Sequence, residues 1–444
     1  MSVQLQDELR AAIREGRLAA GARLSSTRTF AADLGVSRSV VVDAYSQLIA
    51  EGYLTARPGS PTRVNSRAAA PRARPLARES ADPKLSFDFR MGLPDLSLFP
   101  RLEWGRALRR ALARAADSEL GYPDPRGALR LRRELATYLG RVRGVQADPE
   151  RIVICNGFAQ GLGLVCQVLV STGRSIAVED PGSPPAWRAM APTGIDQIPV
   201  PVDKDGIRVE ALEASRASSV LITPAHQYPT GVALAPERRT ELLDWARDDR
   251  LVIEDDYDAE FRYDRQPVGA LQGLSPEDVV YAGSTSKTLA PSLRLGWLVL
   301  PTRLLDDVVA AKRAADLGSP ALEQLALADL LERGSYDRQL RKVRRAYSAK
   351  RATLVSSLTH HAAELAVTGI AAGLHTVLEL PSGISEPSMV AAARERSVGV
   401  SSLGRFRLAS SAPPAAITLG YGSLAAGAIP AGVQRLAAAL GDLS

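Results

Sequence analysis

Short apolar runs rich in β-branched residues alternate with helical stretches from Phe87 onward, and this alternation restricts the possible folds of the chain more than any other feature. Five runs carry the pattern: 151–155, 175–178, 219–223, 251–254 and 279–282. Buried strands that alternate with helices are typical of a mostly parallel sheet covered on both faces. We therefore predict an α/β domain over residues 85–444. Because 444 residues exceed what one core usually serves, a further domain is expected.

The composition excludes several other classes of protein. The only two cysteines, Cys155 and Cys166, fall in stretches that read as buried, so neither a disulfide nor a metal framework is predicted. No apolar run reaches the roughly 18 residues of a membrane span, and the N-terminus lacks the layout of a signal peptide. We expect a cytoplasmic protein without a membrane partner. The net charge of +6 permits nucleic acid binding but does not demonstrate it.

The N-terminal part of the chain has the pattern of a small DNA-binding module. Leucine and isoleucine recur every four residues over 4–15, as on an amphipathic helix. Helices are predicted over 26–34 and 37–52, and the intervening Gly35 favours termination of the first. Two short helices joined by a glycine-containing turn form a helix-turn-helix, whose second helix reads DNA. Residues 53–64 are predicted to form a strand-turn-strand wing.

Residues 3–64, and above all the run RLSSTRTFAADLGVSRSVVVDAYSQLIAEGYLTARPGS, resemble the winged helix-turn-helix of the GntR family of transcriptional regulators. The resemblance implies binding to a double-stranded DNA operator. Arg38, flanked by hydroxyl groups, suits phosphates or a guanine edge. Pro61 departs from the family's wing and removes a backbone donor there. A small helical dimerisation cap with solvated arginines remains the alternative. The predicted DNA-binding residues are Arg28, Ser37, Arg38, Ser39 and Gly59.

Residues 65–84 contain three prolines and five cations but almost no large apolar side chain. This composition predicts a semi-extended linker without a core of its own. Its cations either contact DNA phosphates or serve solubility alone, and the sequence does not decide between the two. The predicted domains are therefore a winged helix-turn-helix over 1–64, a flexible basic linker over 65–84 and the α/β domain over 85–444.

Lys287 stands in the run YAGSTSKTLAPSLRLGW, after a turn rich in glycine and serine and seven positions before Arg294. About thirty residues earlier, the predicted strand 251–254 leads into a cluster of carboxylates and a tyrosine. This combination suits pyridoxal 5′-phosphate, which needs an amine for its aldehyde, cations and amides for its phosphate, and an anion beside its pyridinium nitrogen. Because ligands of parallel sheets collect at the carboxyl ends of the strands, we expect these groups to meet there.

Residues 85–441 resemble the fold-type I, class I aminotransferases, in the motifs FDFRMGLPDLSLFP, TPAHQYPTG, VIEDDYDAEFRY and STSKTLAPSLRLGW. Together with the winged helix, the whole chain is identified as a member of the MocR subfamily of GntR-type regulators. The resemblance implies that Lys287 forms the internal aldimine, that Asp255 pairs with the pyridine nitrogen and that Tyr257 hydrogen-bonds the phenolic oxygen. The groups that it assigns to the phosphate are Arg294, Ser284, Ser286, Gly157, Phe158 and Ala159.

The same resemblance gives Tyr122 a role between subunits, because it matches a tyrosine that reaches the phosphate of a neighbouring subunit. A homodimer with sites built from two chains is implied. Asp256 and Asp258 are expected to be solvated acids at the end of a strand, and His226 is expected to be a hydrogen-bonded structural histidine.

Two departures from the family bear on function. Ser183 replaces an aromatic residue that lies over the cofactor ring, so stacking is lost unless Phe158 or Trp187 substitutes. Thr418 stands where aminotransferases often hold the substrate carboxylate with an arginine. The leading hypothesis is therefore a PLP-dependent transcriptional regulator that senses PLP itself or an amine without a carboxylate. An active aminotransferase with an appended DNA-binding module and an architectural DNA-binding dimer with a vestigial cofactor site remain as alternatives.

Overall fold

The computed structural model describes the chain apart from residues 67, 69–84, 248, 265–267, 410–414 and 444. The chain divides into two compact units, Met1–Pro83 and Lys84–Ser444. Most of the predicted linker, 65–84, lies outside the described residues, so the linker stays a prediction. Among the helices that are described, none combines the length and the hydropathy needed to cross a bilayer.

The described part of the N-terminal unit contains three helices and a two-stranded antiparallel sheet. Their bounds are α1 Ser2–Arg14, α2 Thr27–Leu34, α3 Arg38–Ala50, β1 Leu54–Thr55 and β2 Arg63–Val64. The helices α2 and α3 form the predicted helix-turn-helix, and β1 and β2 form the strands of the predicted wing.

Local caps and one small core explain these elements. The Ser26 hydroxyl accepts a hydrogen bond from the amide of Thr29 at 3.1 Å, and Gly35 ends α2 in the left-handed region at φ +64°. Each fully buried leucine or valine contributes about 1.5–3 kcal/mol to the stability of the fold, and a unit of this size depends on such contributions. The buried side chains of this core are Leu9, Ile13, Ala31, Val41, Tyr45, Leu48, Leu54 and Val64.

The second unit is built around an eight-stranded sheet with the order β4-β11-β10-β9-β8-β5-β6-β7. The five central strands from β10 to β6 are mutually parallel, whereas β4, β11 and β7 pair antiparallel with their neighbours. All five predicted strand runs lie in this sheet, which confirms the predicted mostly parallel α/β architecture. The bounds are β4 Ile152–Cys155, β5 Ile176–Asp180, β6 Gln197–Asp203, β7 Gly206–Ile207, β8 Ser219–Ile222, β9 Leu251–Asp256, β10 Val279–Ser284 and β11 Gly296–Val299.

Helices cover both faces of this sheet, because alternate residues of each strand point to opposite sides. In β4, Ile152 and Ile154 face the layer of α4, α5 and α11, while Val153 and Cys155 face the layer of α6, α7 and α10. Helices α8 and α9 extend the first layer. Both cysteines are buried and free, as predicted. The helix bounds are α4 Arg101–Arg114, α5 Leu129–Arg143, α6 Phe158–Ser171, α7 Pro184–Met190, α8 Val209–Ala214, α9 Pro236–Trp245, α10 Thr302–Asp316 and α11 Ala321–Glu332.

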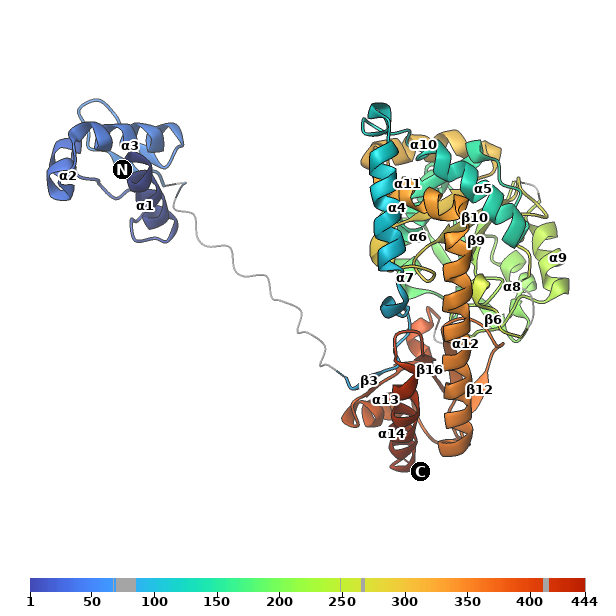
Figure 1. Cartoon of the computed structure of the whole chain (residues 1–444). Helices are drawn as coiled ribbons and strands as arrows, with labels where there is room; N and C mark the ends of the chain where they lie inside the picture. Colours follow the sequence, from blue (N-terminus) through green and yellow to red (C-terminus); the bar gives the residue numbers. More distant parts are fainter. Residues whose placement is uncertain (67, 69–84, 248, 265–267, 410–414, 444) are drawn as a thin grey trace. The chain divides into compact units, whose positions relative to one another are not determined.

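A smaller antiparallel sheet, β12-β13-β16-β15, forms the C-terminal part of this unit together with α13 and α14. Figure 1 shows α12 as one long helix that extends from the region of the large sheet to this C-terminal part. Strand β3 pairs with β14, which places the segment after β3 against the smaller part. The bounds are α12 Ser335–His361, α13 Glu386–Glu395, α14 Ile429–Gly441, β3 Phe87–Asp88, β12 Ala366–Thr368, β13 His375–Glu379, β14 Val398–Gly399, β15 Ser401–Ser402 and β16 Ala416–Gly420.

Candidate cofactor site and DNA-binding surface

Lys287 lies just beyond the carboxyl end of β10, where the sequence places it. Its Nζ donates a hydrogen bond to the carbonyl oxygen of Gly92 at 2.5 Å. Burial lowers the pKa of the Lys287 ammonium, and the carboxylates of Asp258 and Asp255 oppose that shift. A lysine with a lowered pKa is more often the neutral amine, which is the form that attacks a carbonyl carbon.

Asp255 lies near the end of the neighbouring strand β9, opposite Ala282 of β10. Burial and the negative charges of Asp256 and Asp258 raise the pKa of Asp255 well above its usual range, and Lys287 counteracts them. A cation that comes next to a carboxyl group in this environment stabilises its ionised form. The protonated ring nitrogen of pyridoxal phosphate is such a cation, so Asp255 fits the predicted partner of that nitrogen.

A buried network supports the hydroxyl group of Tyr257. Nδ1 of His226 lies 3.1 Å from the Tyr257 hydroxyl and 2.9 Å from a carboxylate oxygen of Asp258. Burial raises the pKa of Tyr257 well above 10, so Tyr257 stays a neutral phenol that can donate a proton to a ring oxygen. His226 is buried and hydrogen-bonded, as predicted, whereas Asp258 is 1% exposed and not a solvated acid. His375, which the sequence analysis missed, lies against His226 with ring centroids 5.0 Å apart.

Asp256 is also not the solvated acid that the sequence predicted. It accepts hydrogen bonds from Nε of Arg143 at 2.6 Å and from the Tyr281 hydroxyl at 2.7 Å. Arg143 and Asp256 are both buried, and they lie 113 positions apart in the chain. Neighbouring residues of a strand point to opposite faces, so Asp256 joins the helix layer behind the sheet while Asp255 faces Lys287. This pair anchors the end of β9.

The N-terminus of α6 and Arg294 form a cradle for an anion. In the described residues no acceptor takes the amide protons of Phe158 and Ala159, which are in the first turn of the helix. Arg294 donates to the carbonyl of Asn156 at 2.5 Å, and a Cβ on Gly157 would lie 2.8 Å from the Arg294 guanidinium. Free amides, a helix N-terminus and a guanidinium are the donors that a phosphate requires.

Two further observations complete this region. Ser284 and Ser286 are half-buried at the end of β10, and the Ser286 amide donates to the Ser284 hydroxyl at 3.4 Å. Asp316 of α10 accepts hydrogen bonds from Asn156 at 3.1 Å and from Gln160 at 2.7 Å. It thereby fixes the loop before α6. The sequence analysis missed Asp316, because its distance along the chain leaves no local signal.

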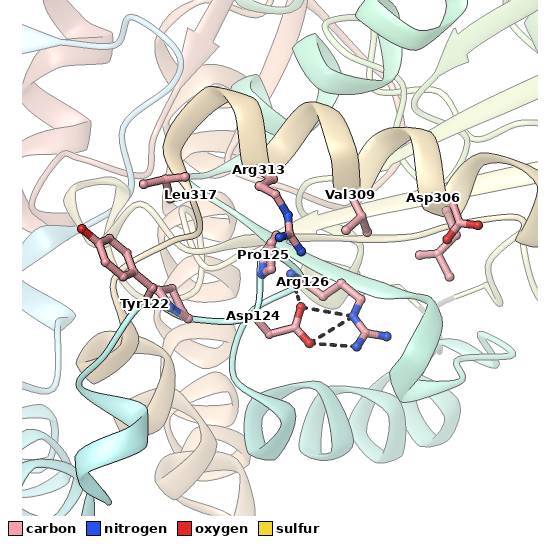
Figure 2. Close-up of a pocket in the computed structure, with 10 residues that line it drawn as sticks. Tyr122, Asp124, Pro125, Arg126, Asp306, Val309, Arg313 and Leu317 are labelled. Atoms are coloured by element: carbon pink, nitrogen blue, oxygen red, sulfur yellow. Dashed lines mark hydrogen bonds and ion pairs between the residues drawn. The ribbon is translucent and has the colours of Figure 1, made fainter.

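Tyr122 projects from the surface and is 89% exposed. It lies at a surface cavity of about 650 Å³ that Arg126, Arg313 and Leu317 also line. Figure 2 shows its ring directed away from the ion pair of Asp124 with Arg126. The Tyr122 hydroxyl has no hydrogen-bond partner within the described residues. An exposed tyrosine in this position is available to another molecule.

In the N-terminal unit, the side chains or backbone of the five predicted DNA-binding residues are all exposed. The side chains of Arg28 and Arg38 make no hydrogen bond or ion pair within the described part of the chain. Ser37 occupies the N-cap position of α3, but its hydroxyl contacts that of Ser39 at 2.8 Å and no backbone amide. Gly59 takes φ +76° at the turn of the wing. The start of α3 therefore presents a free guanidinium between two hydroxyl groups.

Comparison with known proteins assigns each of the two units to a known family. Residues 1–64 match the family described as bacterial regulatory proteins, gntR family, and residues 93–415 match aminotransferase class I and II. The probable rhizopine catabolism regulatory protein MocR of Rhizobium meliloti is 33% identical, over 99% of this chain and 93% of its own length. The chain belongs to the MocR subfamily of GntR-type transcriptional regulators.

Further relatives of this MocR-type regulator agree with this assignment. The pyridoxine biosynthesis transcriptional regulator PdxR of Corynebacterium glutamicum is 35% identical over 84% of this chain and 82% of PdxR. An archaeal alanine:glyoxylate aminotransferase has a TM-score of 0.75 at 29% identity, covering 81% of this chain and 91% of that structure. The α-aminoadipate aminotransferase LysN from Thermus thermophilus has a TM-score of 0.73 at 30% identity, covering 81% and 93%. These likenesses confirm the predicted subfamily and fold class.

The departures from the MocR and aminotransferase patterns have structural explanations. The Ser183 hydroxyl accepts a hydrogen bond from the Ala186 amide at 3.4 Å and so caps α7. Trp187 and Phe158 both pack against the core layer of α6 and α7. Thr418 is fully buried in β16, where its hydroxyl donates to the Ser401 carbonyl at 3.4 Å. Position 418 therefore offers no charge to a ligand in this chain.

Proposed function

We propose that this MocR-type protein is a one-component transcriptional regulator whose affinity for an operator depends on what its aminotransferase-like unit binds. One observation carries the proposal: a single chain combines a recognition helix, whose Arg38 side chain has no partner among the described residues, with a buried lysine, Lys287, beside the carboxylates of Asp255 and Asp258. The first requires DNA as a partner, and the second requires a small molecule.

The small molecule is pyridoxal 5′-phosphate. Lys287 would supply the amine, Asp255 would hold the ring nitrogen and Tyr257 would donate to the ring oxygen. The phosphate would be held by the cradle of Arg294, Gly157, Phe158 and Ala159, with the two serines after β10. When bound, the cofactor supplies an aldehyde that combines with amines and a ring that withdraws electrons from them. In support, the similar enzyme LysN has been solved with N-(5′-phosphopyridoxyl)-L-leucine.

The functional state is a homodimer. Tyr122 is exposed and has no hydrogen-bond partner among the residues of its own chain that the structure describes, while Arg294 lies beside an open surface cavity of about 470 Å³. Tyr122 of the partner subunit would reach the phosphate beside Arg294, as the family pattern implies. Each cofactor site would then require both chains, and cofactor binding would strengthen the dimer.

The proposed control of DNA binding by the cofactor follows from thermodynamic linkage between the two binding events. A ligand can shift the DNA-binding modules between two arrangements only if it binds one arrangement more tightly, and DNA then affects the ligand's affinity to the same extent. The effector is PLP itself or an amine that combines with it.

The test follows visible absorption while the full-length protein is titrated with PLP, and then measures DNA binding with and without the cofactor. The DNA is a fragment that the protein itself selects from random sequences. We expect a cofactor band that Lys287→Ala abolishes, and a change of DNA affinity when PLP is added. Arg38→Ala should weaken DNA binding by about 1–3 kcal/mol, whereas the exposed control Arg17→Ala should not. A cofactor band without any DNA response would refute the regulatory coupling.

An aminotransferase remains the second candidate, because the lysine, acid, tyrosine and arginine of the cofactor site are all present. The 2-aminoadipate transaminase of Thermus thermophilus is 31% identical over 80% of this chain. Repeated conversion of an amino donor to its oxo acid, with matching amination of an added oxo-acid acceptor, would establish this activity. Conversion limited to one equivalent per site would favour sensing.

A further inference from the structure

The loop that follows α10 is organised by a buried lysine, Lys312. Its side chain is fully buried, and its Nζ donates to both carboxylate oxygens of Asp316, at 2.7 and 2.6 Å, and to the hydroxyl of Ser319 at 3.0 Å. Burial opposes ionisation of Asp316, but Lys312 and Gln160 hold its pKa below the ordinary value. Because an unpaired buried charge is costly, the lysine and the carboxylate constrain each other's position.

On one side, Asp316 supports the anion cradle of its own chain. Its carboxylate accepts hydrogen bonds from the side chains of Asn156 at 3.1 Å and of Gln160 at 2.7 Å. The Gln160 side-chain oxygen in turn accepts from the Asn156 amide at 2.7 Å, and the Asn156 carbonyl accepts from Arg294. Asp316 therefore holds the turn that leads into α6 and, through it, the arginine that would bind the phosphate.

On the other side, the same loop packs against the segment that carries Tyr122. The Asp316 carboxylate accepts from the Gly318 amide at 2.9 Å, and Gly318 takes φ +126° against Pro123. A Cβ at position 318 would lie only 2.7 Å from Cγ of Pro123. Figure 2 shows Leu317 beside Tyr122 at one surface cavity. The loop after α10 therefore restrains the backbone next to Tyr122.

A second contact holds the far end of that segment. Gln324 of α11 is fully buried, its side-chain nitrogen donates to the Ser319 carbonyl at 2.9 Å, and its side-chain oxygen accepts from the Ala128 amide at 2.8 Å. Ser319 is also the residue whose hydroxyl accepts from Lys312. Both ends of the segment 122–128 are therefore attached to the loop that the buried ion pair organises.

We propose that Lys312 and Asp316 are positioning residues for two cofactor sites at once, the site of their own chain and the partner subunit's site, which Tyr122 of this chain would complete. The inference rests on the proposed homodimer and adds a physical connection between its two sites. Asp316 would act on its own site through Gln160 and on the other site through Gly318.

Mixed dimers of the full-length protein separate these two effects. One subunit carries Lys287→Ala, which removes the cofactor band, so the band reports only the site of the other subunit. Two different affinity tags isolate the mixed dimer. A second substitution is placed either in the reporting subunit, where it tests a residue's effect on its own site, or in the Lys287→Ala subunit, where it tests the effect on the partner's site. PLP affinity is measured by titration of the band.

The three positions should give three different patterns. Asp316→Asn should weaken PLP binding by roughly tenfold in both arrangements, because it removes a charge that the surrounding donors require. Gln160→Ala should weaken binding only in the reporting subunit, and Gly318→Ala only in the Lys287→Ala subunit. Asp307→Asn is the same substitution at an exposed position of α10 and should change neither affinity.

Thermal unfolding is recorded for every variant. A general loss of stability would weaken binding alike in both arrangements, whereas the proposal requires opposite patterns for Gln160→Ala and Gly318→Ala. These two variants decide the question even if Asp316→Asn does not fold. An effect of Asp316→Asn on the reporting subunit alone, or equal patterns for the other two variants, would overturn the connection.

Tyr122→Phe in the Lys287→Ala subunit separates this inference from the proposed function. If that variant leaves PLP affinity unchanged, or if the PLP-bound protein is a monomer, the proposed shared site is wrong and the inference is wrong with it. If Tyr122→Phe weakens binding there but Asp316→Asn in the same subunit does not, only the role of Asp316 is refuted.

Discussion

Replacing Gly157 with alanine tests the anion cradle directly. Gly157 precedes α6 at φ +79° and ψ 171°, a region that is almost restricted to glycine. An alanine there costs about 1–3 kcal/mol of backbone strain. Its Cβ would also lie 2.8 Å from Nη2 and 2.9 Å from Cζ of Arg294, so the guanidinium must move away.

The displacement of Arg294 determines the expected size of the effect on cofactor affinity. A hydrogen bond to a charged group contributes about 1.5–3 kcal/mol, and each 1.4 kcal/mol changes an equilibrium constant about tenfold. We therefore expect Gly157→Ala to weaken PLP binding by roughly ten- to a hundredfold. The assay is titration of the cofactor-free protein with PLP, followed by visible absorption, with thermal unfolding of the same protein measured alongside.

Gly173, at the other end of α6, provides the matched control. It takes φ +70°, but an added Cβ there would have no neighbour within 4 Å. Gly173→Ala should therefore cost about 1–2 kcal/mol of stability through strain alone and leave PLP affinity unchanged. If Gly157→Ala binds PLP as tightly as Gly173→Ala does, Arg294 and the start of α6 do not hold the phosphate.

Two further predictions concern buried charges. Burial raises the pKa of Glu179 to about 7, which means that the folded state holds a proton that the unfolded chain releases near its ordinary pKa of about 4.3. Stability should therefore fall as pH rises from about 4.5 to 7, by on the order of 3 kcal/mol from this group, and Glu179→Gln should flatten that part of the curve in urea unfolding. Asp256→Asn would leave the buried Arg143 without a counter-charge and should destabilise the fold by about 3–5 kcal/mol in the same assay. A loss of stability below about 1 kcal/mol would contradict the buried ion pair. Replacing both Arg143 and Asp256 by apolar residues of similar size should restore much of the stability that Asp256→Asn removes.

The sequence predicted the elements well because their signals are local. The cap at Ser26, the stop at Gly35 and the alternation along β4 each depend on a few neighbouring residues. The setting of Lys287 is local too, because the strand before it and the turn around it are contiguous. Their meeting with Asp255 followed from the parallel register of β9 and β10, which the alternation of strands and helices already predicts.

Predictions from the sequence were wrong where the partner of a side chain lies far away along the chain. Asp255, Asp256 and Asp258 look alike as a strand-end cluster, yet the first faces Lys287, the second pairs with Arg143 and the third holds His226. No local pattern separates them, since burial and charge partners decide whether an acid is solvated.

The sequence by itself therefore determined the two folds and the family, because caps, periodicity and motifs are properties of short segments. Only the tertiary structure decided the surroundings of each buried charge. Arg143 and Asp256 illustrate the physical reason, because they form a buried ion pair although they lie 113 positions apart in the chain. A binding site is set by which groups share a small volume, and packing brings together residues that no spacing along the chain relates.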